Sequence, residues 1–262
     1  MSPYSNVALI GASISTSRGG GNLGQSILKA LLASRFNVTV LSRAESTTKF
    51  DPTVKLSRQD ALVLAVGSAS LDFQKEIIDI AVEVGVKRII PSEFGSDLTN
   101  EATLKAVPVY QQKVDIMEYL KKAVASHPQT TWTSIVSGPF YDWALCGPPA
   151  FPAGKYKNQY IFISEYTICQ NDIFAAVQQA TGTTVSDWKV EHCDAEALRK
   201  KGYERVEKED FYGLYDLIFA AHFQAGHGAE FSTIRKLENK AIRLEGEGES
   251  LLDCTKRVLS EI

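Results

Sequence analysis

The sequence predicts an α/β fold: a doubly wound parallel sheet covered by helices, followed by a smaller and mainly helical lobe. Short apolar runs alternate with amphipathic runs from residue 7 to residue 138, which is the rhythm of such a sheet. The run "CGPPAFPAG" at 146–154 interrupts this rhythm, because its prolines and glycines continue neither a helix nor a central strand. We therefore expect a sheet domain over residues 1–145 and a substrate-binding lobe over residues 146–262.

Five apolar runs of the first domain predict strands. One of them, "ALVLAVG", is apolar on both faces, as is typical of a strand buried within a parallel sheet. The predicted strands are "VALIG" (7–11), "NVTVLSR" (37–43), "ALVLAVG" (61–67), "VKRIIPSEFG" (86–95) and "TWTSIVSG" (131–138).

Amphipathic spacing predicts the helices between these strands. They cover residues 24–35, 71–85 and 110–127. In the first helix, four apolar residues share one face, which we expect to pack on the sheet. These residues are Ile27, Leu28, Leu31 and Leu32.

The lobe is expected to begin with a strand and to end in helices. A strand at 159–165 should rejoin the sheet of the first domain, and "WKVEHCD" at 188–194 predicts another strand. Helices are predicted at 169–182, 195–208, 210–224 and 250–261.

The composition excludes several classes of protein. A chain of 262 residues, 44% of them hydrophobic, can bury a sizeable core. Its net charge of -3 gives no general attraction to nucleic acid or to an anionic membrane. No apolar run approaches the ~20 residues that span a bilayer, and "MSPYSNVALIG" lacks the basic start of a signal peptide. We expect a cytoplasmic protein with no nucleic-acid or membrane partner.

The cysteines and histidines are not spaced as metal ligands. Cys146, Cys169, Cys193 and Cys254 form no C-x-x-C pair, which favours free thiols over a disulfide framework or a zinc site. The four histidines also lack the spacing of a metal cage. We expect no metal site.

A glycine-rich turn after the first strand suggests a dinucleotide site. Gly11 ends the apolar run, and an amphipathic run begins near Asn22. Such a turn presents backbone N–H groups to a pyrophosphate at the positive end of the following helix. With residues 14–20 set aside as an insertion, Gly11, Gly21 and Gly24 form a G-x-x-G-x-x-G pattern. Alone the pattern is weak, because glycine-rich loops also serve as simple linkers.

Arg43 makes the prediction more specific. It follows the second strand, where an acidic residue would bind the ribose 2′-hydroxyl of NAD and an arginine suits the 2′-phosphate of NADP. The alternative is an ordinary surface arginine. In the strand–turn–helix setting, these residues favour a Rossmann-type domain that binds NADPH.

Two later segments carry a family resemblance. The segment "VGVKRIIPSEFGSDLTN" (84–100) precedes a helix that contains a lysine, "YQQKVDIMEYL" (110–120). With "GNLG" (21–24), "SGPFYDW" (137–143) and the helical tail, they resemble the NmrA-like family of atypical short-chain dehydrogenases. The resemblance is greatest to its isoflavone reductase and phenylcoumaran benzylic ether reductase branch. Most of the chain takes part, and "PSEFG" is the most specific piece.

The resemblance implies roles for the matching residues. Lys113 matches the family's active-site lysine. Phe140, Tyr141 and Trp143 could form the wall of a pocket for an aromatic substrate. The implied cofactor-binding residues are Gly11, Ser13, Gly21, Asn22, Leu23 and Gly24 at the pyrophosphate, Arg43 at the 2′-phosphate, Ala65, Val66 and Gly67 at the adenine–ribose side, and Ser92, Glu93, Phe94 and Lys113 near the nicotinamide.

Each of these roles has a simpler structural alternative. Lys113 could be a solvated helix position, although it lies beside the apolar face formed by Val114, Met117, Leu120 and Val124. The three aromatic residues could close the core. Tyr110 and Lys113 are three residues apart, so they are not the Tyr-x-x-x-Lys pair of ordinary short-chain dehydrogenases.

The chain departs from the family pattern in three places. The insertion at 14–20 lengthens the phosphate-binding turn. Only 17 residues separate "NVTVLSR" from "ALVLAVG", too few for the family's third strand and the helix after it, because a parallel crossover takes about a dozen residues. The segment "FPAGKYKNQYIFIS" also leads directly into the late strand, where relatives carry a longer segment.

Two functions are compatible with this sequence. One is an NADPH-dependent oxidoreductase that transfers a hydride to a small aromatic acceptor, with Lys113 as proton donor. The other is a non-catalytic NADP-sensing regulator with a protein partner, or an inactive truncated copy. Lys113 and the aromatic residues favour the enzyme.

Overall fold

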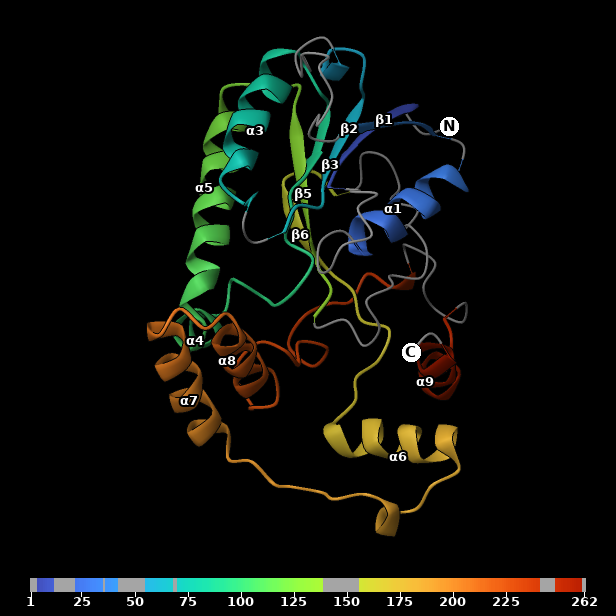
Figure 1. The fold of residues 1–262 in the computed structure, drawn as a ribbon. Coiled ribbons are helices and arrows are strands. Elements are labelled where there is room, and N and C mark those ends of the chain that lie inside the picture. The colour runs from blue at the N-terminus through green and yellow to red at the C-terminus, as the bar shows by residue number, and fades with distance from the viewer. Residues whose placement is uncertain are drawn as a thin grey trace.

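Six parallel strands form the centre of the protein, in the order β2-β1-β3-β4-β5-β6 (Figure 1). The computed structural model describes residues 4–11, 22–34, 36–41, 55–67, 70–138, 156–240 and 248–260. The predicted α/β fold with its parallel sheet is confirmed.

The elements alternate along the chain before a helical tail begins. Their bounds are β1 Asn6–Ile10, α1 Asn22–Leu32, β2 Asn37–Leu41, β3 Ala61–Leu64, α3 Phe73–Glu83, β4 Arg88–Ile90, α4 Glu101–Ala106, η2 Pro108–Tyr110, α5 Gln111–Ala125, β5 Thr131–Val136, β6 Gln159–Phe162, α6 Gln170–Thr181, η3 Val185–Asp187, α7 Ala195–Glu207, α8 Tyr212–His222 and α9 Leu251–Ser260.

The order in which strands are added to the sheet reverses at β1: β2 lies on one side of it, and β3 and the later strands lie on the other. In the register, Val7 pairs with Val38 of β2 on one side and with Ala61 of β3 on the other. Successive strands therefore lie on opposite sides of β1, and ligands of open α/β sheets bind beyond the carboxyl ends of the strands at such a point.

Helices cover both faces of the sheet. The helices α3 and α5 lie on one face and α1 lies on the other, as Figure 1 shows. Ile77, Ile116 and Leu120 belong to the buried cluster on the α3–α5 side. Leu31 belongs to the cluster on the α1 side, where Ile27 and Leu28 pack against it. These apolar stripes hold the helices on the sheet.

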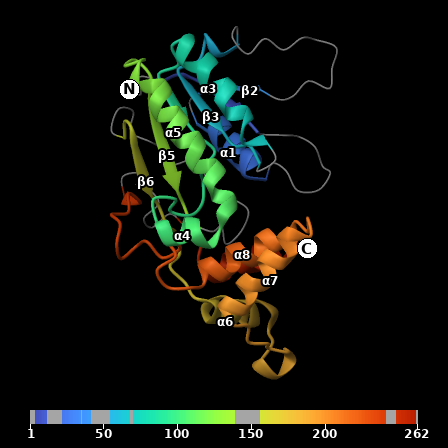
Figure 2. The same ribbon diagram turned by 90° about the vertical axis from the view of Figure 1, so that its left-hand side faces the viewer.

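The tail forms helices beyond the carboxyl ends of the strands (Figures 1 and 2). Two glycines let the backbones of α7 and α8 approach closely, because a Cβ on Gly213 would lie 2.6 Å from the carbonyl oxygen of Gly202. Leu217 and Ala221 of α8 pack in turn with Ala106 and Val107, next to α5. This packing fixes α8 beside the part of the sheet domain that carries Lys113.

Several expectations about single elements are confirmed. The strand β6 rejoins the sheet beside β5, and the four helices expected after residue 168 form as α6, α7, α8 and α9. Lys55 and Leu56 lie in a short helical turn and not in a strand. Among the described residues, β2 is therefore the edge strand, as expected if the family's third strand is missing.

Two expectations are wrong, and one helix was not predicted. Residues 188–194 form no strand, because this segment is exposed throughout and lies beside no partner strand, so its apolar residues (Trp188 and Val190) have no sheet to pack on. Leu32 is 63% exposed at the end of α1 and does not pack on the sheet. The helix α4 was not predicted: Asn100 caps it by accepting hydrogen bonds from the N–H groups of Ala102 and Thr103.

Among the helices that the structure describes, none combines the length and the apolar composition of a membrane span.

Candidate nucleotide-binding and catalytic site

Three of the predicted cofactor segments, among the residues that the structure describes, lie at one edge of the sheet. Because the strands are parallel, their carboxyl ends meet at the same edge. Gly11 follows β1, Ala65–Gly67 follow β3 and Ser92–Phe94 follow β4. Direct contacts join these three segments.

Gly11 has a conformation and a neighbour that exclude any side chain. Its φ is +104°, and a Cβ atom there would lie 2.1 Å from the carbonyl oxygen of Ala65. The N–H of Ala65 donates a 2.8 Å hydrogen bond to Ile10. The backbones after β1 and β3 thus pass in contact, whereas Gly67 opens onto free space.

The start of α1 suits an anion. The helix begins at Asn22, and its first turn carries no acidic residue. Gly24 is buried, and Leu23 packs against the core on the α1 side of the sheet. The free N–H groups of a helix start favour a phosphate, so these residues and the Gly11 turn fit the pyrophosphate of a dinucleotide.

Ser92 ties the end of β4 to the end of β3. Its hydroxyl donates a 2.9 Å hydrogen bond to the carbonyl of Val66, and its N–H donates one of 2.9 Å to the side chain of Gln74. Gln74 and Ser92 are both buried. The turn after β4 is therefore anchored to both β3 and α3.

Phe94, two residues after Ser92, has an unusual backbone conformation. Phe94 has a φ of 35°, in the left-handed region that a bulky side chain rarely adopts. Its ring is buried in the core on the α1 side, and Gly95 forms a bridge to Val136 at the end of β5. Packing on both sides holds the turn in this conformation, and such strain is concentrated at functional sites.

Lys113 reaches this turn from the first turn of α5. Its ammonium group donates a 2.6 Å hydrogen bond to the backbone carbonyl of Glu93. The side chain is half-buried beside Ile116 and Met117, the buried face of the helix. Burial lowers the pKa of Lys113, and the negative charge of Glu93 partly opposes this shift.

Glu93 is a buried carboxyl group in the same turn. Only 6% of the residue is exposed, and burial raises the pKa of its carboxyl to about 7, against the opposing charges of Lys113 and Lys121. Two titratable groups with oppositely shifted pKa values thus lie together at the carboxyl edge of the sheet. Such a pair is typical of sites that transfer protons.

A second polar group adjoins this turn. The hydroxyl of Ser96 lies 3.2 Å from that of Tyr110 and 2.7 Å from Nε2 of His222. Burial lowers the pKa of His222 to about 4, so its ring is neutral near pH 7. The sequence did not predict this group, because His222 lies 126 residues from Ser96. The sequence holds one hint of this contact, because His222 lies in a predicted helix that is rich in aromatic residues.

An ion pair braces the turn from the tail. The Nε and Nη2 atoms of Arg235 donate hydrogen bonds of 3.0 and 2.9 Å to one oxygen of Asp97. The side chain of Asp97 is completely buried. Removing one partner of a buried ion pair lowers the free energy of unfolding by about 3–5 kcal/mol. Arg235 therefore helps to hold residues 93–97 in place.

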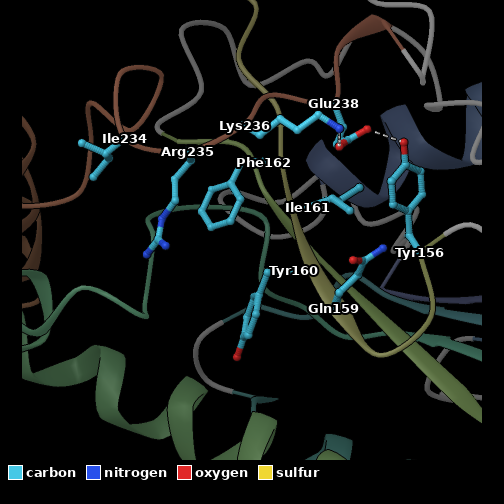
Figure 3. A pocket seen from close by; sticks show the side chains of 9 residues that line it. All are labelled: Tyr156, Gln159, Tyr160, Ile161, Phe162, Ile234, Arg235, Lys236 and Glu238. Atoms are coloured by element: carbon cyan, nitrogen blue, oxygen red, sulfur yellow. Dashed lines mark hydrogen bonds and ion pairs between the residues drawn. The ribbon is translucent and has the colours of Figure 1, made fainter.

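A hollow of about 540 Å³ lies beside β6. Tyr160 and Phe162 point to one side of this strand and Ile161 to the other (Figure 3). The guanidinium of Arg235 lies 5.0 Å from the centre of the Phe162 ring. The described site residues at the sheet edge do not line the hollow, so we do not assign it to the cofactor.

Some predicted site residues lie outside the described residues. They are Ser13, Gly21, Arg43, Phe140, Tyr141 and Trp143. Across the described ranges, no three His, Cys, Asp or Glu side chains are grouped so as to hold a metal ion.

Comparison with known proteins places this chain among oxidoreductase relatives. The profile of the NmrA-like family matches residues 53–161. The chain is 29% identical to "Oxidoreductase aprR" of Aspergillus flavus, over 86% of this chain and 92% of that protein.

Two solved structures are similar over almost the whole chain. One, from a study of pinoresinol-lariciresinol and phenylcoumaran benzylic ether reductases, has a TM-score of 0.70 at 14% identity and covers 97% of this chain and 98% of its own. The complex of leucoanthocyanidin reductase with NADPH from Vitis vinifera has a TM-score of 0.66 at 16% identity and covers 97% and 99%. The match to the NmrA-like family over residues 53–161 confirms the family resemblance predicted from "PSEFG" and the lysine helix.

Proposed function

We propose that the protein is an NADPH-dependent reductase that transfers a hydride to a small aromatic acceptor. The observation that carries the proposal is the contact of Lys113 with the Glu93 carbonyl, at the carboxyl edge of a sheet whose switch point is formed by Gly11 and Ala65. Ligands of such sheets bind at this edge. The oxidoreductase name of the relative aprR agrees with this assignment.

The cofactor would be held by the first β–α turn and the neighbouring strand ends. Gly11, Asn22 and Gly24 would contact the pyrophosphate through backbone N–H groups. Ala65–Gly67 would line the adenine–ribose side, and Ser92–Phe94 would lie near the nicotinamide. A bound nicotinamide cofactor supplies the hydride. The leucoanthocyanidin reductase solved with NADPH supports this choice of cofactor.

Lys113 would supply the proton. The Glu93 carbonyl fixes its ammonium group at the edge of the sheet, and a lowered pKa makes the lysine a better acid. Its partner is a neutral carbonyl, so the ammonium keeps donors for a substrate oxygen. The lobe over residues 146–262 would cover the acceptor.

The first test is the choice between NADPH and NADH. Titration of the purified protein, followed by nicotinamide fluorescence, should give tighter binding of NADPH, because Arg43 would form a charge-assisted bond to the 2′-phosphate. Arg43→Ala should largely remove the difference, whereas Arg58→Ala, at an exposed arginine, should leave it unchanged. Equal affinity of the unmodified protein for both nucleotides would contradict the NADPH assignment.

The second test separates an enzyme from a regulator. A screen of aromatic enones, quinones and benzylic ethers with NADPH should find turnover, measured by the loss of nicotinamide absorbance. Tight NADPH binding with no turnover across the screen would favour the NADP-sensing regulator.

A further inference from the structure

A hollow of about 330 Å³ lies where the helical tail meets α4. Figures 1 and 2 both show α4 at the junction of the sheet domain with α7 and α8. None of the described cofactor residues lines this hollow, and its volume suits a small ligand. The lining residues are Ala102, Lys105 and Ala106 of α4, Arg199 and Tyr203 of α7, and His227 of the loop after α8.

Hydrogen bonds join the walls of this hollow to one another. The hydroxyl of Tyr203 lies 3.2 Å from a carbonyl oxygen in the last turn of α4. The hydroxyl of Thr103 donates to the backbone carbonyl of His227. From α7, Arg199 donates through Nη2 to the side chain of Gln224. The two helices and the loop are therefore held around the hollow before a ligand arrives, which lowers the entropic cost of binding.

The charge of the lining favours an anion. Lys105 and Arg199 are its charged side chains, and no carboxylate is among the described residues that line it. Each cation has an acidic neighbour outside the lining: Glu101 lies 3.7 Å from Lys105, and Glu196 lies 2.7 Å from Arg199. Both carboxylates are largely exposed, and ion pairs with exposed partners contribute little. The two cations therefore remain available to a ligand.

Two nitrogen atoms of the lining side chains have further bonding capacity. The Nε of Arg199 is buried and has no acceptor among the described residues, although leaving such a donor unpaired is unfavourable. At His227, Nδ1 lies 3.2 Å from the carbonyl oxygen of Ala225. A carbonyl oxygen only accepts, so Nδ1 carries the hydrogen of this bond and Nε2 is left for a ligand.

We propose that this hollow binds a phosphate group between Lys105, Arg199 and His227, as free phosphate or as the phosphate of a small metabolite. Phosphate oxygens accept hydrogen bonds in several directions, so one phosphate can meet groups from α4, α7 and the loop together. Hydrogen bonds from cations to phosphate are also about twice as strong as neutral ones. The bound anion would tie α7 to α4. This inference does not depend on the proposed reductase function.

The NMR signal of the His227 ring tests the site directly. The chain has only four histidines, and His227→Gln identifies the signal of His227. The full chain, loaded with NADP⁺, is titrated with inorganic phosphate and separately with glycerol 3-phosphate, at constant pH and with ionic strength balanced by sodium chloride. We expect the His227 signal to shift with a dissociation constant on the order of 1 mM, while that of His192 stays in place. Tighter binding of glycerol 3-phosphate would identify the ligand as a phosphorylated metabolite, and equal or weaker binding as free phosphate.

Charge-neutral variants test the two cations. Arg199→Gln should weaken phosphate binding about ten-fold, and Lys105→Gln about three-fold. Lys200→Gln is the matched control, because it removes the same charge from the next position of α7 but is exposed and does not line the hollow. The side chain of Lys105 is 80% exposed, so Lys105→Gln should fold normally and decides the test if Arg199→Gln does not fold.

Three results would overturn the inference. They are a His227 signal that does not shift up to about 50 mM phosphate, an unchanged affinity in Lys105→Gln, and an equal loss of affinity in Lys200→Gln. Binding of NADP⁺ is measured separately. Its absence would reject the proposed function, whereas the His227 signal reports on the phosphate site alone.

Discussion

The ammonium group of Lys113 donates a 2.6 Å hydrogen bond to the backbone carbonyl of Glu93. This bond joins the start of α5 to the turn after β4, whose backbone is held by Ser92 on one side and by the buried Phe94 on the other. A backbone carbonyl orients the lysine without the flexibility of a carboxylate side chain. Preorganised groups of this kind favour catalysis because they need little reorganisation during the reaction.

Lys113→Ala should abolish turnover and leave NADPH affinity within a few-fold. General acid catalysis is typically worth about 10²–10⁴-fold in rate, and the pyrophosphate contacts lie elsewhere. Steady-state rates and fluorescence titration measure the two effects. Lys122→Ala, at an exposed position of the same helix, is the control. Lys121 is a poorer control, because its charge acts on Glu93. Turnover that survives Lys113→Ala would reject the catalytic assignment.

Glu93→Gln should raise the free energy of unfolding above neutral pH. The pKa of this carboxyl rises from 4.5 to about 7 on folding, so the native state binds more protons than the unfolded state between these values. The unmodified protein therefore loses stability as the pH rises through this window, by about 3 kcal/mol in total.

Urea unfolding at pH 5 and at pH 8 measures this effect. The stability of Glu93→Gln relative to the unmodified protein should rise by about 3 kcal/mol between the two pH values. Glu83→Gln, at an exposed carboxyl group on α3, should show no such change. A constant difference for Glu93→Gln would mean that Glu93 titrates normally.

Much of the fold was predictable because its signals are local. Apolar runs within segments of five to ten residues marked the strands, and periodic spacing marked α6, α7, α8 and α9. The helix α4 escaped because six residues are too few for a periodic pattern, although Asn100 before an acidic residue was a capping signal. The segment 188–194 looked like a strand, but a strand needs a partner, and spacing alone does not show whether one is present.

The candidate site was only partly predictable. The position of Lys113 beside the apolar face of α5 followed from helical spacing, and so did its approach to the "PSEFG" turn. The contact of Tyr110 and Ser96 with His222 could not be predicted in this way. It depends on the tertiary packing of α8, which brings His222 to Ser96 although the two residues are 126 positions apart in the sequence. The raised pKa of Glu93 also comes from burial, which sequence patterns do not quantify.

His222→Gln should remove a loss of stability at acid pH. Burial lowers the pKa of His222 from 6.5 to about 4, so the unfolded state binds more protons between these values and the native state is destabilised as the pH falls. For a largely buried ring the loss is on the order of 3 kcal/mol. Urea unfolding from pH 7 to pH 4 should show a shallower decline for His222→Gln than for the unmodified protein. The exposed control His192→Gln should follow the unmodified protein, and an identical decline in His222→Gln would show that His222 is not held neutral by the fold.

Gly11→Ala should damage both the sheet and the cofactor site. A methyl group there would meet the Ala65 carbonyl at 2.1 Å and would also have to adopt a φ of +104°. The first effect forces β1 and β3 apart, and the second adds backbone strain, so we expect a loss on the order of 3–5 kcal/mol.

Gly85→Ala separates these two effects. Gly85 has a φ of +79°, but nothing lies within 4 Å of its added Cβ, so this variant carries the strain without the clash and should lose about 1–2 kcal/mol. Urea unfolding of both variants gives the difference, which isolates the contact of Gly11 with Ala65. NADPH titration of the folded fraction should then show weakened binding in Gly11→Ala and unchanged binding in Gly85→Ala, because only Gly11 lies where the pyrophosphate would pass. Equal losses of stability in the two variants would mean that β1 and β3 can separate at this point without cost. The contact with Ala65 would then not hold the proposed phosphate-binding turn in place.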